Sequence, residues 1–350
     1  MNHHQQQQPP EIVGTILDDA LAAGASDVYW LPQEDGVLVR RRVAGTQEDV
    51  TTLAGETGQQ CLTHLKMLAG LLTYRTAVAQ DGTIRRREGG TEMRVASMPT
   101  IFGERITVRM MSNAETPDYI EELGFDADVQ AGLRRLLSHP CGMIVLTGPT
   151  GCGKSTTIYA LIRELLREHQ DPTSIITLED PIEKVIGNIS QVNVAAGKDE
   201  WTYEIALRAA LRQDVKTLAV GEMRDRGVVQ VVLDAALTGH RVITTYHAGD
   251  IPSVYARMLH QGFEPFLIAA AVTGVVTQRL IPGVDGKLVP AAALLEPDDA
   301  WREFVCTRPG LGQLRAHVAD RPQADIRRRI TALADQGRIS EEQKSLLTEG

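Results

Sequence analysis

One glycine-rich run constrains the fold of this chain more than any other feature. It reads Gly148-Pro149-Thr150-Gly151-Cys152-Gly153-Lys154-Ser155, with Thr156 directly after it. Its spacing, G-x-x-x-x-G-K-S, is that of a phosphate-binding loop. The apolar run 143–146 precedes it, and an apolar stripe at helical spacing follows: Ile158, Leu161, Ile162, Leu165 and Leu166. A strand, a glycine-rich loop and a helix form the context that a chance glycine-rich turn lacks.

The residue types in this run suit a polyphosphate ligand. Glycines let the backbone approach the ligand closely, and the loop N–H groups and the helix N-terminus point at phosphate oxygens. We expect Lys154 to place its ammonium group near the β- and γ-phosphates, and Ser155 to place its hydroxyl on Mg²⁺. The sequence therefore predicts that a nucleoside triphosphate binds at residues 148–156.

Length and composition limit the class of protein. A chain of 350 residues is long enough for two domains, and its hydrophobic share of 43% is ordinary for a globular protein. We see no apolar stretch near the roughly 20 residues of a membrane span and no secretory signal. A net charge of −9 argues against a broad nucleic-acid-binding surface. Without a C-x-x-C pair, no zinc site or disulfide framework is expected, and a reducing cytosol fits the four cysteines, Cys61, Cys141, Cys152 and Cys306.

The first third of the chain predicts a small α+β domain over residues 11–112. Residues 1–10, rich in His, Gln and Pro, are expected to form a disordered leader. Helices are predicted at 11–23 and 59–72 from their apolar stripes. Strands are predicted at 27–31, 37–41, 82–86, 92–96 and 105–110. In the last of these, Ile106 and Val108 alternate with Arg105 and Arg109, so one face is buried and the other carries cations.

Residues 113–119 are predicted to be a linker, and residues 120–350 a second domain of α/β class. Strands are expected at 143–147, 174–178, 217–221 and 242–246, alternating with helices near 129–138, 156–169, 203–213 and 228–237. This alternation predicts a parallel sheet with helices on both faces and chemistry at the carboxyl ends of its strands. From Ile251 onward we expect mostly helix.

Two acidic strand ends are candidates for water activation and metal binding. Glu222 follows the apolar strand 218–221, the arrangement of a Walker B strand, and is the candidate general base. Glu179 and Asp180 follow the strand 176–178 and could reach the metal or its waters, although Asp-Pro also favours a plain turn. His247 lies just past the strand 241–246, where it could contact a γ-phosphate, and His240 precedes that strand.

Arginines in the first domain are candidates to stabilise charge on the nucleotide. Arg94, Arg105 and Arg109 lie far from the phosphate loop in sequence. A strand face bearing Arg105 and Arg109 is commonly just solvated. The alternative is an arginine that reaches a nucleotide at a domain or subunit boundary. Spacing alone leaves both interpretations open.

Taken together, the motifs resemble those of the secretion motor ATPases, which power type II secretion, type IV pilus assembly and retraction, and DNA-uptake pseudopili. The resemblance runs from about Ala25 to Arg279. It includes the phosphate loop and the segments 25–28, 80–82, 94–100, 103–105, 178–183 (the family's Asp box), 206–214, 220–225, 238–240 and 245–248 (the His box). The segments 122–125, 139–143 and 277–280 look most like the assembly and type II secretion branch, whereas 221–225 looks more like the retraction branch.

The resemblance implies a RecA-like P-loop ATPase domain behind a PAS-like α+β domain, in a ring hexamer with ATP and Mg²⁺ between the domains. It implies that Glu222 is catalytic and His247 a phosphate sensor, and that Ser155, Glu179 and Glu222 surround the metal. Arg94 and Arg109 match the arginines that reach the nucleotide, and Arg208 and Arg212 match arginines near the phosphates. It further implies an inner-membrane platform protein as partner and a cytoplasmic place at the inner face of the membrane. The net charge predicts no nucleic-acid partner, and the scattered cysteines predict no zinc.

Several positions depart from the family pattern. Tyr29 replaces a usual His, Val215-Lys216 a Pro-Asp, and Ala248-Gly249 a Thr-Asn, while the four-cysteine zinc insert of many assembly ATPases is missing. Cys152 replaces a usual Ser or Ala. Because a helix N-terminus lowers a thiol pKa, Cys152 could make binding redox-sensitive, or it could be a tolerated small residue.

The sequence predicts an ATP-hydrolysing ring motor for pilus or pseudopilus assembly or type II secretion. Alternatives are a retraction ATPase, a traffic ATPase of type IV secretion, a DNA-translocating motor, and a nucleotide-binding regulatory scaffold without hydrolysis. Lys154 and Glu222 argue against the last of these.

Overall fold

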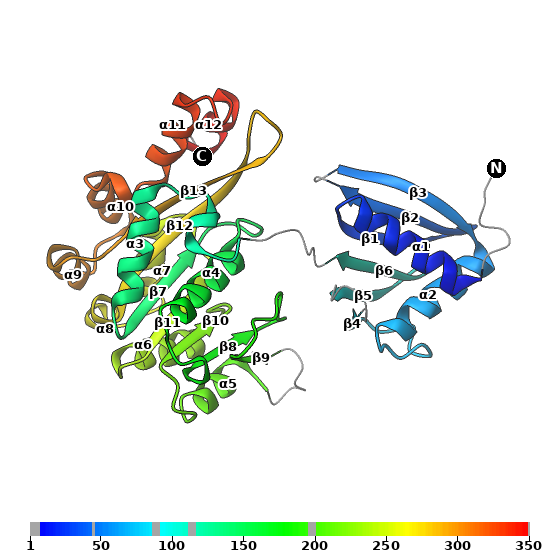
Figure 1. The fold of residues 1–350 in the computed structure, drawn as a ribbon, viewed down its shortest axis with the longest axis horizontal. Helices are drawn as coiled ribbons and strands as arrows, with labels where there is room; N and C mark the ends of the chain where they lie inside the picture. Colours follow the sequence, from blue (N-terminus) through cyan, green and yellow to red (C-terminus); the bar gives the residue numbers. More distant parts are fainter. Residues whose placement is uncertain (1–7, 44–45, 86–91, 111–116, 195–200, 349–350) are drawn as a thin grey trace. The chain divides into compact units, whose positions relative to one another are not determined.

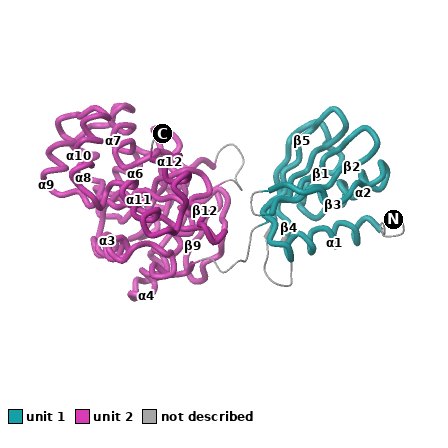
Figure 2. Tube along the Cα trace, turned by 90° about the horizontal axis from the view of Figure 1, so that it is seen from above, with its two compact units in different colours: residues 1–115 teal, residues 116–350 magenta. Residues whose placement is uncertain are grey.

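The computed structural model describes residues 8–43, 46–85, 92–110, 117–194 and 201–348. The chain divides into two compact units, residues 1–115 and 116–350 (Figure 2). The division falls inside the predicted linker 113–119, of which residues 113–116 lie outside the described residues. Most of the predicted leader, residues 1–7, also lies outside them, and its last two residues, Pro9 and Pro10, already belong to the first helix.

Unit 1 contains a six-stranded antiparallel sheet in the order β3-β2-β1-β6-β5-β4. Its strands are β1 (Ala25–Gln33), β2 (Gly36–Val43), β3 (Thr46–Ala54), β4 (Gln80–Arg85), β5 (Glu92–Thr100) and β6 (Gly103–Met110). Helices α1 (Pro9–Ala22) and α2 (Gly55–Leu68) share one buried core with the sheet (Figure 1). The predicted α+β composition is therefore correct.

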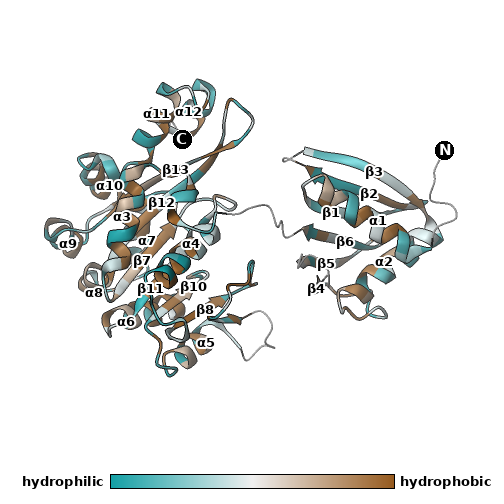
Figure 3. Cartoon of the chain, viewed as in Figure 1, coloured by the Kyte–Doolittle hydropathy of each residue, from teal (hydrophilic) through white to brown (hydrophobic). Residues whose placement is uncertain are grey.

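Hydrophobic alternation explains why β6 was predicted and β3 was not. In β6, Ile106, Val108 and Met110 are buried, whereas Arg105 and Arg109 are exposed. In the edge strand β3 only Leu53 is buried, so the segment has no apolar period to detect. Figure 3 shows β3 mainly in the teal and white of hydrophilic residues.

Unit 2 is built around a seven-stranded sheet in the order β13-β12-β7-β11-β10-β8-β9. Its strands are β7 (Gly142–Thr147), β8 (Ile175–Glu179), β9 (Ser190–Asn193), β10 (Thr217–Val220), β11 (Arg241–Tyr246), β12 (Val272–Pro282) and β13 (Leu288–Leu295). All neighbouring pairs are parallel except β12 with β13. The predicted parallel α/β sheet is confirmed, with one antiparallel edge strand added.

Helices cover both faces of this sheet (Figure 1). On one face α3 (Ala127–Ser138), α4 (Lys154–Arg167) and the 3-10 turn η2 (Ile120–Leu123) pack on inward residues such as Ile144 and Ile243. The other face packs on residues such as Val145 and Val242. It is covered by α5 (Tyr203–Ala210), α6 (Arg226–Leu237), α7 (Ile251–His260), α8 (Pro265–Ala271), α9 (Asp299–Cys306) and α10 (Leu311–Ala319).

The prediction that the chain is mostly helical after Ile251 is wrong for residues 272–295, which form β12 and β13. Consecutive residues in the middle of both strands are buried, without alternation, and periodicity does not separate such strands from buried helix. Beyond them, α11 (Ile326–Asp335) packs Ile326, Ile330 and Leu333 on the far part of this hairpin, and α12 (Glu341–Thr348) follows. Within the described parts of the chain, no helix combines the length and the apolar content that crossing a bilayer would require.

Candidate nucleotide-binding site

The predicted site residues of unit 2 come together because four adjacent parallel strands end at one edge of the sheet. β7 leads into the glycine-rich loop, β8 ends at Glu179, Glu222 follows β10 by one turn residue, and His247 follows β11 directly. In-register pairing of β8, β10, β11 and β7 aligns these ends. A cavity of about 500 Å³ lies there.

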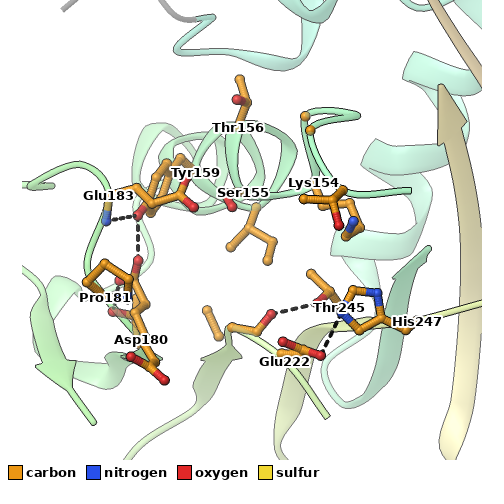
Figure 4. Close-up of a pocket in the computed structure, with 18 of the residues that line it drawn as sticks. Lys154, Ser155, Thr156, Tyr159, Asp180, Pro181, Glu183, Glu222, Thr245 and His247 are labelled. Carbon is orange, nitrogen blue, oxygen red and sulfur yellow. Dashed lines mark hydrogen bonds and ion pairs between the residues drawn. The ribbon is translucent and has the colours of Figure 1, made fainter. Parts of the chain in front are cut away.

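Residues of the loop and of α4 form one wall of this cavity: Thr150, Gly151, Gly153, Lys154, Ser155 and Thr156. Glu222 and His247 line it from the strand ends opposite (Figure 4). Gly151 and Gly153 have φ of 77° and 89°, the left-handed region that favours glycine. The loop therefore curls as its sequence predicts, and α4 begins at Lys154, where its N-terminal N–H groups are available to an anion.

Lys154 donates to carbonyl oxygens of its own loop. Its Nζ lies 3.0 Å from the oxygen of Gly148 and 2.9 Å from that of Pro149. An incoming phosphate would exchange these neutral acceptors for charged oxygens, which form the stronger kind of hydrogen bond. Lys154 lines the cavity, so its ammonium group can reach a phosphate that is bound there.

Glu222 is held by two donors on its two oxygens. His247 Nε2 lies 2.7 Å from Glu222 Oε1, and Arg224 Nε lies 3.0 Å from Oε2. Arg224 also reaches Asp180, with its Nη1 3.0 Å from Oδ2. The bond to Glu222 raises the pKa of Arg224, so this guanidinium stays charged. The predicted base and the predicted phosphate sensor are thus direct neighbours.

Glu179 is buried and satisfied inside the protein. Its Oε1 accepts from Thr177 at 2.5 Å and from Gln191 at 3.0 Å, and its Oε2 accepts from the Tyr159 hydroxyl. Burial raises the pKa of Tyr159, as does Glu179, so the phenol remains a donor. Glu179 also lines the cavity.

Tyr159 connects the loop helix to the Asp box. Its hydroxyl accepts from the backbone N–H groups of Glu183 at 3.1 Å and Lys184 at 3.2 Å (Figure 4). Sequence reasoning missed this residue, although it lies four positions after Ser155 and therefore on the same face of the helix. Other cavity residues without a predicted role are Tyr203, Arg224, Thr245 and Leu280.

The three candidate arginines of unit 1 share the sheet face that lies opposite α1 and α2. Arg94 pairs directly across from Arg109, so the two side chains lie on one face. Arg109 Nε donates to Asp27 at 3.1 Å, and Arg94 lies 3.9 Å from Asp81. The guanidinium of Arg105 lies 5.8 Å from the ring centre of Tyr29. Their role toward a nucleotide stays a prediction, because each unit is described by itself.

Other predicted residues lie outside the cavity. His240 precedes β11, at the opposite edge of the sheet from His247, and contacts the carbonyl of Ala235 at 3.1 Å. Arg208 pairs with Glu204 at 2.9 Å on the same helix, and neither Arg208 nor Arg212 lines the cavity.

Of the two possibilities for Cys152, the structure favours the tolerated small residue over the redox-sensitive thiol. The side chain is buried, and burial raises the pKa of its thiol more than Lys154 and Arg279 lower it. A raised pKa keeps the thiol protonated at neutral pH and removes the physical basis for redox-sensitive binding.

The donor set suits Mg²⁺ bound mainly through a nucleotide. No group of three or more His, Cys, Asp or Glu side chains that could hold a metal occurs among the residues that the structure describes. Mg²⁺ in phosphate sites usually takes only one or two protein ligands besides phosphate oxygens and water. Ser155 and Glu222 line the cavity from opposite sides and fit this pattern.

Comparison with known proteins agrees with this geometry. A family described as "Type II/IV secretion system protein" matches residues 3–331. The chain belongs to this family. The family resemblance deduced from the motifs is thereby confirmed.

Curated relatives of this family member come from secretion and pilus systems. The type II secretion system protein HxcR of Pseudomonas aeruginosa is 35% identical over 297 residues, 84% of this chain and 61% of that protein. The type II secretion system ATPase E of Vibrio cholerae is 37% identical over 77% of this chain and 54% of its own length. The pilus assembly ATPase PilB of Thermus thermophilus is 36% identical over 77% and 30%. The chain thus spans between 30% and 61% of the length of these three relatives.

Solved structures support the same fold. The pilus retraction motor PilT with bound ADP superimposes with a TM-score of 0.78 and 27% identity, covering 96% of both chains. The ATPase DotB of Legionella pneumophila superimposes with a TM-score of 0.80 at 22% identity, which speaks for the fold alone. The predicted P-loop fold behind a small α+β domain is confirmed.

Proposed function

We propose that this chain is an ATP-hydrolysing ring motor that powers type IV pilus or pseudopilus assembly or type II secretion. The observation that carries the proposal is the cavity in which Lys154 and Ser155 face Glu222 and His247. A phosphate cradle opposite a carboxylate at a strand end is what phosphoryl transfer to water requires. The names of the curated relatives point to the same machines.

Binding uses charge and backbone donors of this chain. The loop N–H groups and the N-terminus of α4 take the phosphate oxygens, and Lys154 exchanges its two carbonyl partners for the β- and γ-phosphates. Mg²⁺, which Ser155 and Glu222 would hold, supplies charge neutralisation on the phosphates when bound. Glu179, which lines the cavity as well, accepts from Tyr159 of α4 and so supports this wall.

Hydrolysis uses Glu222 as general base. Its carboxylate accepts a proton from the attacking water while that water's oxygen bonds to the γ-phosphorus and the bond from the γ-phosphorus to the bridging β,γ-oxygen breaks. The products are ADP and inorganic phosphate. His247 and Arg224 each contact one Glu222 oxygen in this structure, and each oxygen keeps a further lone pair for the attacking water. His247 lines the same cavity and is the candidate to contact the departing γ-phosphate.

Mechanical work follows from a nucleotide-dependent conformational equilibrium in a homo-hexamer. The conformation that binds the γ-phosphate more tightly is favoured while ATP is bound, and loss of the γ-phosphate removes part of that preference. Arg94, Arg105 and Arg109 are the candidate arginines for contacting the nucleotide. We place the ring in the cytoplasm, at the inner face of the membrane, acting on a platform protein.

Replacing Glu222 by Gln tests the proposal. This substitution keeps the size of the side chain and removes its basicity, so ATP turnover should fall by about 10²- to 10⁴-fold while ATP still binds. Glu303→Gln, the same chemical change on an exposed position of α9, is the matched control and should keep full turnover. Unchanged turnover in Glu222→Gln would favour the regulatory scaffold instead.

Pilus retraction is the second candidate, because the retraction motor PilT matches this chain over 96% of both lengths. Expression in a strain that lacks its assembly ATPase, and in one that lacks its retraction ATPase, separates the two. Restored pili in the first strain supports assembly, and restored retraction in the second supports the alternative. A turnover rate that rises when duplex DNA is added would instead indicate a DNA motor.

A further inference from the structure

We propose that Gln278 positions the phosphate loop: its side-chain amide holds the Cys152 carbonyl against β12 and so directs the N–H of Gly153 toward the phosphate site. The inference rests on the proposed nucleotide binding at this loop. It concerns a positioning residue, since Gln278 acts through the backbone of the loop and does not line the cavity itself.

The sheet order places Gln278 beneath the loop. β12 lies beside β7, and Thr277 is in register with Thr147, the last residue of β7. The residue after Thr147 is Gly148, where the loop begins. The residue after Thr277 is Gln278, which therefore lies beside the start of the loop. The Gln278 side chain is 2% exposed, so it is enclosed between the strand and the loop.

Both ends of the Gln278 amide are used. Its Nε2 donates to the backbone oxygen of Cys152 at 2.7 Å, and its Oε1 accepts from the Thr157 hydroxyl at 3.1 Å. A carbonyl oxygen can only accept, so the amide nitrogen must face Cys152, and the amide oxygen is then left for Thr157. One side chain thereby joins the loop, the first turn of α4 and β12.

The peptide bond between Cys152 and Gly153 links the Gln278 contact to the cavity. In a trans peptide the C=O and the following N–H point in opposite directions. With the Cys152 oxygen held against β12, the N–H of Gly153 is directed away from β12, and Gly153 lines the cavity. If this peptide turned over, a carbonyl oxygen would face the bound phosphate and repel it.

Close packing around Gln278 supports the same role. A Cβ atom on Gly148 would lie 2.4 Å from the backbone oxygen of Gln278, and one on Gly153 would lie 3.3 Å from its Nε2. The two glycines thus let both ends of the loop rest on this residue. Glycine also leaves the 152–153 peptide free to rotate, which is why an external hydrogen bond is needed to select one orientation.

Gln278→Met is the decisive variant, since it keeps the length of the side chain and removes both hydrogen bonds. The dissociation constants of ADP and ATP, measured by calorimetry on the full chain, should rise at least tenfold. KM for ATP should rise similarly while kcat changes less than about threefold, because the N–H contact is made equally in ground and transition states. Thr157→Val removes the Oε1 contact and the 3.2 Å contact of the Thr157 hydroxyl with the Gly153 carbonyl, but keeps the bond from Gln278 to Cys152. It should change nucleotide affinity less than about threefold.

Three results would overturn the inference. One is wild-type affinity in Gln278→Met while the wild-type chain binds nucleotide normally. Another is an equal loss of affinity in Thr157→Val, which would point to general packing. If Gln278→Met does not fold, the Gly153 amide resonance of the ¹⁵N-labelled wild type decides: it should shift strongly when ADP is added, and an unmoved resonance refutes the inference. A wild-type chain that binds neither nucleotide refutes the proposed function itself.

Discussion

The buried ion pair of unit 1 offers the sharpest test of how this domain is held together. Lys66 of α2 is 1% exposed and Glu104 of β6 is 4% exposed. Lys66 Nζ donates to both carboxylate oxygens, at 2.7 and 2.9 Å, and to the carbonyl of Arg75 at 2.8 Å. Lys66→Met preserves the apolar stem and leaves the Glu104 carboxylate buried without its cation.

Removing one partner of a buried pair costs about 3–5 kcal/mol, because the remaining charge loses its compensation. Whole domains are stable by only about 5–15 kcal/mol, so Lys66→Met should bring unit 1 close to unfolding. The double variant Lys66→Met/Glu104→Leu removes both charges and should recover most of the loss, since an apolar pair of similar volume often replaces a buried ion pair without cost. In the double variant the Arg75 carbonyl still lacks the hydrogen bond that Lys66 donates, so a smaller loss of stability remains.

Urea denaturation followed by hydrogen exchange and mass spectrometry measures this effect on the full chain, with peptides from residues 1–115 reporting on unit 1. The single variant should lower the free energy of unfolding of those peptides by at least 3 kcal/mol and leave unit 2 unchanged. A loss below about 1 kcal/mol, or a double variant as unstable as the single one, would refute the reasoning. Because Glu104 directly precedes Arg105, the outcome also tells whether this pair supports β6, the strand that carries Arg105 and Arg109.

Three further predictions concern single contacts. Tyr159→Phe removes one of three donors to the buried Glu179 carboxylate and the acceptor shared by two backbone N–H groups. It should cost about 1–3 kcal/mol in urea unfolding and lower ATP turnover. The bond to Lys184 lowers the pKa of Asp118, so its contribution to stability is complete above the ordinary aspartate pKa of about 4 and is lost below it. Urea midpoints of Asp118→Asn and wild type should therefore differ at pH 7 and converge toward pH 3. Gly82→Ala would place a Cβ 2.3 Å from the Ala69 carbonyl and should destabilise unit 1 by about 1–3 kcal/mol. Gly14→Ala, in open space on α1, should stabilise it by about 0.5–1 kcal/mol in the same assay, and equal effects of the two would contradict this account.

Much of the fold can be predicted from the sequence because the patterns that indicate its helices, strands and loops are local. The glycine run at 148–155 combines a turn, a strand before it and an amphipathic helix after it within one short stretch, and each signal acts over a few residues. The strand β6 was predicted for the same reason. Where a strand lacks alternation, as in β3 and in the β12–β13 hairpin, only pairing with a distant neighbour defines it.

By itself the sequence determined the phosphate loop, the alternating α/β pattern of unit 2 and the residues that follow its strands. These depend on backbone preferences and on side chains within a few positions of each other. Only the tertiary structure decided which of those residues meet. The order of the parallel strands puts β10 beside β11 and so brings Glu222 beside His247. The register of β12 against β7 places Gln278 next to the phosphate loop. Strand order and register arise from packing of the whole domain, so no short window of sequence contains them.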